Sequence, residues 1–304
     1  MKKLKILLLI TLSITLLSSC SPAATTGSYT ISAQGMRSIS LAQSSEFSVS
    51  RVVVLANGVA EIINSLGGNS ILIGRDISST IDSLEKIPVV TSGHQVLPEK
   101  IISLNPDLVI IDASTGPKTA LDQIRSAGIK VVQTPESWSL TDIPKKIRAV
   151  GAAIGALSAA EQLIMKMDDS YNNTELLNRP RVAFLYLRGS SSIYLLGGPG
   201  SGADSLLEKI GAIDIGSRTQ EKAFNTLTAE ALATLNPEVI LVMSKGLESV
   251  GGVSGLIKLP GVAQTKAGKE KKIIDVDDSL LLSFGPRTPA LIEALSVAIK
   301  KVAP

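Results

Sequence analysis

The sequence predicts an α/β protein of two similar lobes with mostly parallel sheets, joined by one long rigid helix, with a ligand in the cleft between the lobes. One phrase occurs twice: LPEKIISLNPDLVII runs from Leu97 to Ile111, and TAEALATLNPEVILV runs from Thr228 to Val242, 131 residues later. Each copy reads as an amphipathic helix and an apolar strand, because the residue before proline avoids the α region and ends the helix. Strands also alternate with helices on both sides of a central helical stretch, which is typical of α/β folds.

The composition excludes several classes of function. The chain has 304 residues, 44% of them hydrophobic and 19% charged, so two packed domains are possible. One His and one Cys exclude a metal site built from several such side chains, and a disulfide framework. Lys2, Lys3 and Lys5 account for the net charge of +3, since the rest of the chain carries 27 basic and 27 acidic residues. This balance favours neither nucleic acid nor an electrostatic membrane patch.

The N-terminus reads as a lipoprotein leader. Met1–Lys5 is basic, and the apolar stretch Ile6–Leu17 is too short to span a bilayer. The sequence Leu-Ser-Ser-Cys that ends at Cys20 resembles the lipobox of bacterial lipoproteins, whose cysteine is lipidated and becomes residue one; an ordinary signal peptide is the alternative. We expect a signal peptide at 1–19, a lipidated Cys20 with a flexible tether at 20–50, and an extracytoplasmic protein, periplasmic if the cell has an outer membrane.

Residues 51–139 are expected to form the N-terminal lobe. Arg51–Leu55 is a continuous apolar run, typical of a buried parallel strand, and helices and strands alternate from there to the strand Ile129–Gln133. Ligands of such sheets gather at the carboxyl ends of the strands. Asn57 and His94 both lie in loops of this kind.

Residues 140–178 are expected to bridge the lobes. Asp142–Ile154 and Ser158–Leu177 read as helices, with Ser158 as an N-cap and Glu161 completing a capping box. A helix of about 20 residues spans roughly 30 Å. Since the segment lacks the composition of a flexible linker, we expect one rigid helix, and a cleft that opens by small angles.

Residues 179–304 are expected to form the C-terminal lobe. The strand that begins at Arg181 matches the one that begins at Arg51, and alternation puts Phe184, Tyr186 and Arg188 on one face. Tyr186 and Arg188 come at the carboxyl end, where the cleft is expected. The glycine-rich loop 197–202 lacks the Gly-Lys-Ser/Thr ending of a P-loop, so nucleotide binding is not expected.

Catalysis has little support in the sequence. No G-x-S-x-G elbow accompanies His94. Asp277 and Asp278 are adjacent, so their carboxylates point apart on a strand or turn. We therefore do not expect an enzyme.

The residue types best suited to a ligand are His94 and Tyr186. Taken alone, His94 reads as a surface loop residue and Tyr186 as a core aromatic. A cation at Arg188 would favour the phenolate of Tyr186, which is a hard anionic ligand for ferric iron. His with Tyr is a chemically sensible axial pair for ferric haem. Met243, at the end of the strand after the second repeat, either lines the pocket or belongs to the core.

From Arg51 to its end the chain resembles the periplasmic-binding-protein family that delivers haem, ferric siderophores and cobalamin to ABC importers. The nearer resemblance is to the haemin-binding lipoproteins of actinobacterial-type haem importers. The phrases that carry it cover most of the chain: TSGHQVLPEKIISLNPDLVI, FLYLRG, LLGGPGSGADSLLEKIGAIDIG, KGLESVGGVSGLIKLPGVAQT and LLLSFGPRTPAL. The resemblance implies the class III architecture, two α/β lobes with a single helical bridge.

The resemblance also implies a ligand set. Its haem-binding members ligate iron with a histidine of the first lobe and a tyrosine of the second, supported by an arginine two residues beyond the tyrosine. His94, Tyr186 and Arg188 match this pattern. A further tyrosine expected near Phe224 is absent, which weakens the hydrogen bonding around the ligand without removing it. Arg287 is a candidate partner for a haem propionate.

Members of the family present one acid on each lobe to arginine pockets of the permease. Glu61 is the candidate in the first lobe, and Asp204 or Glu208 in the second. The alternative is that these are ordinary solvated acids.

We therefore expect a monomeric, lipid-anchored protein that captures ferric haem as a transported ligand and delivers it to the permease and ATPase subunits of an ABC importer. A ferric-siderophore or cobalamin binder of the same family is one alternative, although siderophore sites usually need several basic residues. A lipoprotein adhesin or signalling partner is the alternative from another class. Through the offset of 131 residues His94 falls on Asn225, so the repeat predicts a symmetric frame around an asymmetric site.

Overall fold

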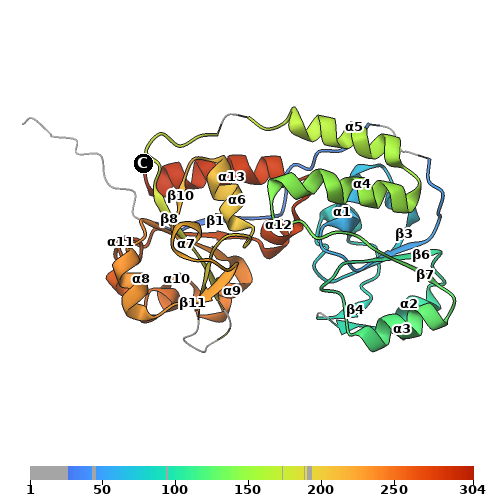
Figure 1. Ribbon diagram of the computed structural model, residues 1–304, viewed down its shortest axis with the longest axis horizontal. Coiled ribbons are helices and arrows are strands. Elements are labelled where there is room, and N and C mark those ends of the chain that lie inside the picture. Colours follow the sequence, from blue (N-terminus) through green and yellow to red (C-terminus); the bar gives the residue numbers. More distant parts are fainter. Residues whose placement is uncertain (1–26, 43–45, 94, 173, 188, 190–193) are drawn as a thin grey trace, which may run out of the picture.

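Both predicted lobes are present in the computed structural model, which describes residues 27–42, 46–93, 95–172, 174–187, 189 and 194–304. Figure 1 shows the lobes side by side beneath a layer of helices. Among these residues no helix combines the length and the apolar character needed to cross a bilayer.

The first lobe is built on a four-stranded parallel sheet in the order β3-β2-β6-β7. Its central strands are fully buried because helices or loops cover both faces of the sheet. Side chains alternate between two core clusters, with Val52 and Val54 in one and Val53 in the other. The elements are β2 (Val52–Val54), α1 (Val59–Ser65), β3 (Leu72–Arg75), β4 (Thr91–Ser92), β5 (Gln95–Val96), α2 (Pro98–Ser103), β6 (Leu108–Ile111), α3 (Lys118–Ser126) and β7 (Lys130–Gln133).

The second lobe is built on a seven-stranded sheet in the order β1-β13-β12-β8-β9-β11, with β10 paired to β8. The pairs that involve β9 are antiparallel and the others are parallel, so the predicted fold class is confirmed. The strands are β1 (Tyr29–Ile31), β8 (Arg181–Leu187), β9 (Tyr194–Gly197), β10 (Ile213–Asp214), β11 (Phe224–Thr226), β12 (Val239–Met243) and β13 (Ile273–Val276). The helices are α6 (Ala203–Lys209), α7 (Ile215–Thr219), α8 (Ala229–Leu235), α9 (Ser244–Ser249), α10 (Gly252–Leu256), α11 (Lys266–Glu270), α12 (Asp278–Ser283) and α13 (Thr288–Val302).

The repeated phrase forms the same unit in each lobe, α2 with β6 and α8 with β12. Both helices end at an asparagine in the left-handed region, with φ of 47° at Asn105 and 44° at Asn236. The tertiary contacts repeat as well. Arg51 donates to the carbonyl of Leu104, and its counterpart Arg181 donates to the carbonyl of the residue before Asn236. The acid two residues after each asparagine accepts the backbone N–H of that arginine.

The bridge differs from the prediction. Two helices of 12 residues, α4 (Ile143–Ile154) and α5 (Leu157–Asp168), pack against each other in place of one long helix. The predicted helix to Leu177 is wrong, because residues 169–174 read Asp-Ser-Tyr-Asn-Asn-Thr and are poor helix formers. The predicted capping box is also wrong. Helix α5 begins after Ala156 without a side-chain cap, and Glu161 instead forms an ion pair with Arg148 at 2.7 Å.

The flexible tether predicted for residues 20–50 is wrong over the part that the structure describes. Tyr29–Ile31 forms β1 along the edge of the second sheet, and Ile31 is 3% exposed. Residues 46–49 then lie against the bridge and the first lobe, where Phe47 and Val49 pack on the core. The prediction failed because the Ser-rich composition of this segment obscures the apolar side chains that occur within it.

One core cluster extends through both lobes and the bridge. It includes Val54 of β2, Ile147 of α4, Phe184 of β8 and Leu295 of α13. Because this core is continuous, the lobes are packed against each other at their inner ends rather than linked only through a hinge.

Candidate functional site

Tyr186 lies near the carboxyl end of β8, half-buried, on the face of the second sheet that carries Phe184. Its ring packs on Phe224 of β11, with ring centroids 5.3 Å apart and planes tilted by 59°. Phe224 also meets Phe184 edge-on, at 6.4 Å between centroids. The predicted sharing of one face is therefore confirmed for Phe184 and Tyr186, and position 224 is next to the phenol ring but carries no hydroxyl.

Three predicted site residues lie outside the described residues: His94, Arg188 and Cys20. The segments that flank position 94, β4 and β5, form a two-stranded antiparallel hairpin. In Figure 1 the label β4 marks this hairpin on the side of the first lobe that faces the second lobe. The pairing of His94 with Tyr186 remains a prediction.

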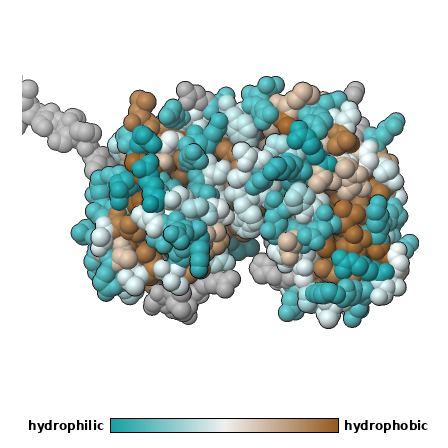
Figure 2. All heavy atoms as spheres, in the orientation of Figure 1, coloured by the Kyte–Doolittle hydropathy of each residue, from teal (hydrophilic) through white to brown (hydrophobic). Residues whose placement is uncertain are grey.

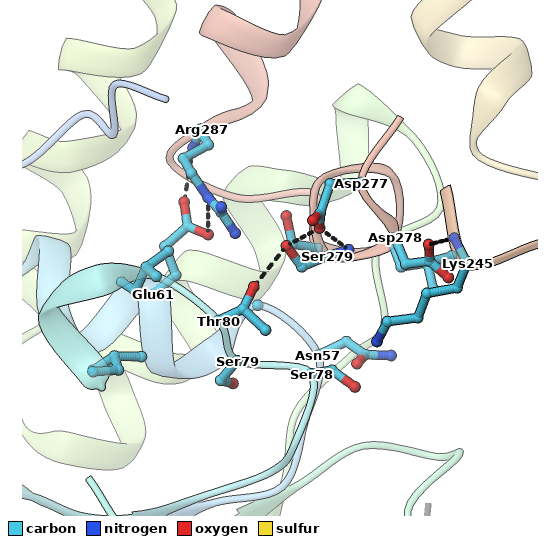
Figure 3. Close-up of a pocket in the computed structure, with 15 residues that line it drawn as sticks. Asn57, Glu61, Ser78, Ser79, Thr80, Lys245, Asp277, Asp278, Ser279 and Arg287 are labelled. Atoms are coloured by element: carbon cyan, nitrogen blue, oxygen red, sulfur yellow. Dashed lines mark hydrogen bonds and ion pairs between the residues drawn. The ribbon is translucent and has the colours of Figure 1, made fainter. Parts of the chain in front are cut away.

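The lobes are separated by a notch that opens on the lower side of Figure 2. At the inner end of the inter-lobe space lies a cavity of about 160 Å³. Figure 3 shows side chains of the first lobe facing side chains of the second lobe across it. The first lobe contributes Asn57, Gly58, Glu61, Ser78, Ser79, Thr80, Ile81 and Leu84; the second contributes Lys245, Asp277, Asp278, Ser279, Leu282, Ser283 and Arg287.

This inner cavity is not the site that the sequence predicts. Tyr186 is not among its lining residues, and its volume is below the 300–1,000 Å³ or so of usual small-molecule sites. Hydrogen bonds between the lobes partly close it: Thr80 Oγ1 donates to Ser279 Oγ at 3.0 Å. Asp277 and Asp278 point apart as predicted, since Asp277 accepts from Ser279 and Asp278 accepts from the backbone N–H of Lys245.

Glu61, the predicted docking acid of the first lobe, is buried in this structure, and its contact with a permease remains a prediction. Its carboxylate pairs with the guanidinium of Arg287 at 2.8 Å and accepts the backbone N–H of Arg287 at 2.9 Å. The two side chains are 3% and 4% exposed. Glu61 is buried because α1 places it against the segment that precedes α13. A charge buried there is stable only when it is paired with an opposite charge.

Arg287, the predicted partner of a haem propionate, already uses one side of its guanidinium group to pair with Glu61. Its Nη1 is buried and has no hydrogen-bond partner among the described residues, and the side chain lines the inner cavity. Its role toward a propionate remains a prediction.

The remaining predicted site residues, Met243, Asp204 and Glu208, differ in how far they are buried. Met243 is 5% exposed and belongs to the core that Phe184 shares; it does not line the inner cavity. Asp204 is half-buried and accepts the backbone N–H of Gly200 at 2.7 Å. Glu208 is exposed on α6.

Lys146, which was not among the predicted site residues, is a buried cation at the seam between the two lobes. It is 3% exposed, and its Nζ on α4 donates to the carbonyl of Ser283 at the end of α12, at 2.8 Å. Burial lowers the pKa of Lys146 to about 8, although Asp112 and Glu61 oppose this shift. The only signal in the sequence was that this lysine stands among apolar residues of an amphipathic helix. A lysine in such a helix normally faces the solvent, so its burial was not predicted.

The pKa of Lys146 predicts how stability depends on pH. Because the pKa in the folded protein, about 8, is below 10.5, the unfolded chain binds more protons between these values. The free energy of unfolding is therefore expected to rise from pH 8 to pH 10.5 by at most roughly 3 kcal/mol. Urea titrations of the wild type and of Lys146→Met at several pH values would measure it. The prediction is wrong if both proteins show the same pH profile.

Comparisons with known proteins identify the fold. Residues 52–280 match the family model described as periplasmic binding protein. The solved structure of the periplasmic heme-binding protein RhuT from Roseiflexus sp. RS-1 is 35% identical, with a TM-score of 0.78, over 84% of this chain and 100% of that chain. The uncharacterized ABC transporter substrate-binding lipoprotein YvrC of Bacillus subtilis (strain 168) is 26% identical over 82% of this chain and 79% of its own length.

A more distant relative is named cobalamin-binding protein, from Halobacterium salinarum (strain ATCC 29341 / DSM 671 / R1), at 25% identity over 63% of this chain. The match spans about half of that protein, 53% of its length. The solved structure of RhuT shares the fold of this chain, and the name of YvrC describes that relative as a substrate-binding protein of an ABC transporter. The chain therefore belongs to the periplasmic binding protein family, as a substrate-binding protein of an ABC transporter of the haem, siderophore and cobalamin group.

Proposed function

We propose that this protein captures ferric haem outside the cytoplasm, between its two lobes, and delivers it to an ABC importer. The observation that carries the proposal is Tyr186, a phenol at the carboxyl end of a central strand, half-buried and held by an aromatic neighbour. A phenolate in such a position is a hard anionic ligand suited to ferric iron. RhuT, which is 35% identical over its whole length, is named as a heme-binding protein.

In the proposed complex, apolar burial of the porphyrin between the lobes provides most of the affinity. His94 and Tyr186 coordinate the iron on opposite faces, which selects haem over an iron-free porphyrin. Arg188 supports the phenolate by its charge. Arg287 lines the inner cavity and is the candidate partner of a propionate that reaches it.

The test is a titration of haemin into the domain that begins at Gly27, followed by absorption spectroscopy. A Soret shift that saturates at a defined stoichiometry is expected. His94→Ala is expected to change the spectrum of the complex. Absence of a Soret shift at stoichiometric haemin would exclude the proposal. Parallel titrations with cyanocobalamin and a ferric siderophore test the alternatives, the first of which the cobalamin-binding relative favours.

The proposal includes a lipid on Cys20, which keeps the protein at the membrane after export. The name of YvrC contains the word lipoprotein. Mass spectrometry of the N-terminal peptide from the native membrane is expected to find a diacylglyceryl group on the cysteine. Cys20→Ala protein is expected in the soluble fraction, and its retention in the membrane would contradict the anchor.

Docking to the permease needs an exposed acid on each lobe, and the repeat provides one pair. Glu99 of α2 and Glu230 of α8 occupy equivalent positions, 131 residues apart, and both are exposed. Figure 1 shows α2 and α8 on the lower side of the molecule, and the notch of Figure 2 opens on that side. We propose that these two acids, rather than Glu61, meet basic residues of the permease.

Charge reversal tests this pair. The variant Glu99→Lys/Glu230→Lys is expected to reduce haem uptake into vesicles that contain the permease and ATPase by at least roughly tenfold, because like charges would meet at the interface. Its affinity for haemin is expected to be unchanged. Asp169→Lys is the matched control, an exposed acid at the end of α5 on the upper side of Figure 1. Equal uptake by all three proteins would place the docking surface elsewhere.

A further inference from the structure

We infer that the N-terminal segment is a strap, residues 29–42 and 46–49, that joins both lobes and the bridge and fixes the angle between the lobes. The connection between the lobes would then consist of two parts, the bridge helices and this strap. The proposal concerns lobe motion in the ligand-free protein and does not depend on which ligand is bound.

The strap begins as an integral part of the second lobe. Tyr29, Thr30 and Ile31 pair in register with Ile274, Asp275 and Val276 of β13. Thr30 Oγ1 donates to Asp275 at 2.8 Å, and the carbonyl of Ile31 accepts the N–H of Asp277 at 2.9 Å. The side chain of Ile31 is buried in the common core. This end of the strap is therefore attached as firmly as a strand of the sheet.

The strap then crosses the seam between the lobes within four residues. Ile39 donates its backbone N–H to Pro286 of the second lobe at 3.0 Å, and Leu41 donates to Ser65 of the first lobe at 2.9 Å. Directly before them, Ser38 Oγ lies 3.2 Å from Ser65 Oγ and 3.4 Å from the carboxylate of Glu61. Hydrogen bonds to both lobes within so short a segment resist any separation of the lobes at this point.

The strap also contacts the bridge. The carbonyl of Ser40 accepts from Lys166 Nζ of α5 at 2.6 Å, and the N–H of Ser48 donates to the carbonyl of Ile154 at 2.9 Å. Gly155, with φ of 78°, closes α4 directly against Ser48, and a Cβ there would collide with it. A larger residue at 155 would therefore disturb the strap as well as the helix end.

These contacts explain why the inner cavity is small and closed. The strap, the pair Glu61–Arg287 and the bond from Lys146 to Ser283 all meet at the seam. A wide opening of the lobes would have to break backbone hydrogen bonds and a buried ion pair together. The lobes are thus expected to move by small angles, which pre-organises the mouth of the cleft for its ligand.

Hydrogen exchange tests the strap in the unmodified domain that begins at Gly27. The amides of Ile39, Leu41 and Ser48 are expected to exchange at least about 100-fold more slowly than in an unstructured chain, because each donates to a buried or ordered carbonyl. Exchange at the unstructured rate would overturn the proposal, since a tether has no such protection.

Distance measurements test the effect on the lobes. The native chain has one cysteine, Cys20, which this domain lacks, so spin labels at Ser103→Cys and Thr234→Cys are unique. Both positions are exposed and are equivalent in the two repeats. Pulsed spin-resonance spectroscopy is expected to give one narrow distance distribution without ligand.

Weakening the strap is expected to broaden that distribution. The variant Ser38→Ala/Leu41→Ala removes contacts with the first lobe, whereas Ser32→Ala/Gln34→Ala changes two exposed residues of the same strap. Broadening only in the first variant, with both variants folded by circular dichroism, supports the proposal. Equal widths in all three proteins would overturn it. Since no haem is present, this result is separate from the outcome of the haemin titration.

Discussion

The variant Tyr186→Phe is expected to bind haemin at least about 10- to 100-fold more weakly than the wild type. A loss of that size follows removal of a group that only supports a metal ligand, and Tyr186 is proposed as a ligand itself. The substitution removes one oxygen and retains the ring, so packing on Phe224 and Phe184 is preserved. The ferric absorption spectrum is expected to lose the features of phenolate coordination. Titration of haemin into the variant, followed by absorbance, measures both effects.

The matched control is Tyr194→Phe. Tyr194 lies on β9 in the same lobe, but its ring belongs to a different core cluster and its hydroxyl donates to the carbonyl of Pro260 at 2.6 Å. Its loss is expected to lower the free energy of unfolding by about 1 kcal/mol and to leave haemin binding unchanged. If the two variants bind haemin equally well, Tyr186 is not a ligand.

The variant Glu61→Leu is expected to destabilise the protein by about 3–5 kcal/mol, because it leaves the guanidinium of Arg287 buried without its counter-charge. The pair is almost fully inaccessible and its N–O distance is 2.8 Å. The double variant Glu61→Leu/Arg287→Met is expected to recover most of this loss, since two apolar side chains then replace two charges. Urea unfolding followed by circular dichroism measures all three proteins.

An exposed pair provides the comparison. Arg148 and Glu161 form an equally short ion pair, at 2.7 Å, but with side chains 47% and 44% exposed. Glu161→Leu is expected to change stability by no more than about 1 kcal/mol. A similar small effect for Glu61→Leu would show that the charge at the seam is solvated in solution and that the seam opens readily.

The sequence predicts those parts of the fold that depend on local periodicity. The repeated helix and strand follow from apolar spacing and from Asn-Pro, and both copies have the predicted bounds to within about one residue. The shared face of Phe184 and Tyr186 follows from strand alternation. These features need only neighbouring residues, so they can be identified without knowledge of tertiary contacts.

Several readings of the sequence failed at contacts between distant segments, whereas the predicted helix to Leu177 and the capping box failed within the bridge itself. Glu61 reads as a solvated acid because its partner Arg287 is 226 residues away. The strap reads as a tether because Ile31 becomes buried only against β13. Lys146 was not singled out in the sequence because the Ser283 carbonyl that accepts its hydrogen bond belongs to the distant second lobe. Burial of charged groups depends on tertiary structure, which composition and periodicity do not report.

The pairing of β1 with β13 also determines the order in which the two lobes can fold. The first sheet uses only residues 52–133, so it can form before the rest of the chain is available. The second sheet needs Thr30 beside Asp275, a separation of 245 residues. Contacts so far apart in sequence form slowly. The first strand of the domain must therefore wait for almost the last, and until then β1 is unpaired and open to pairing with another chain.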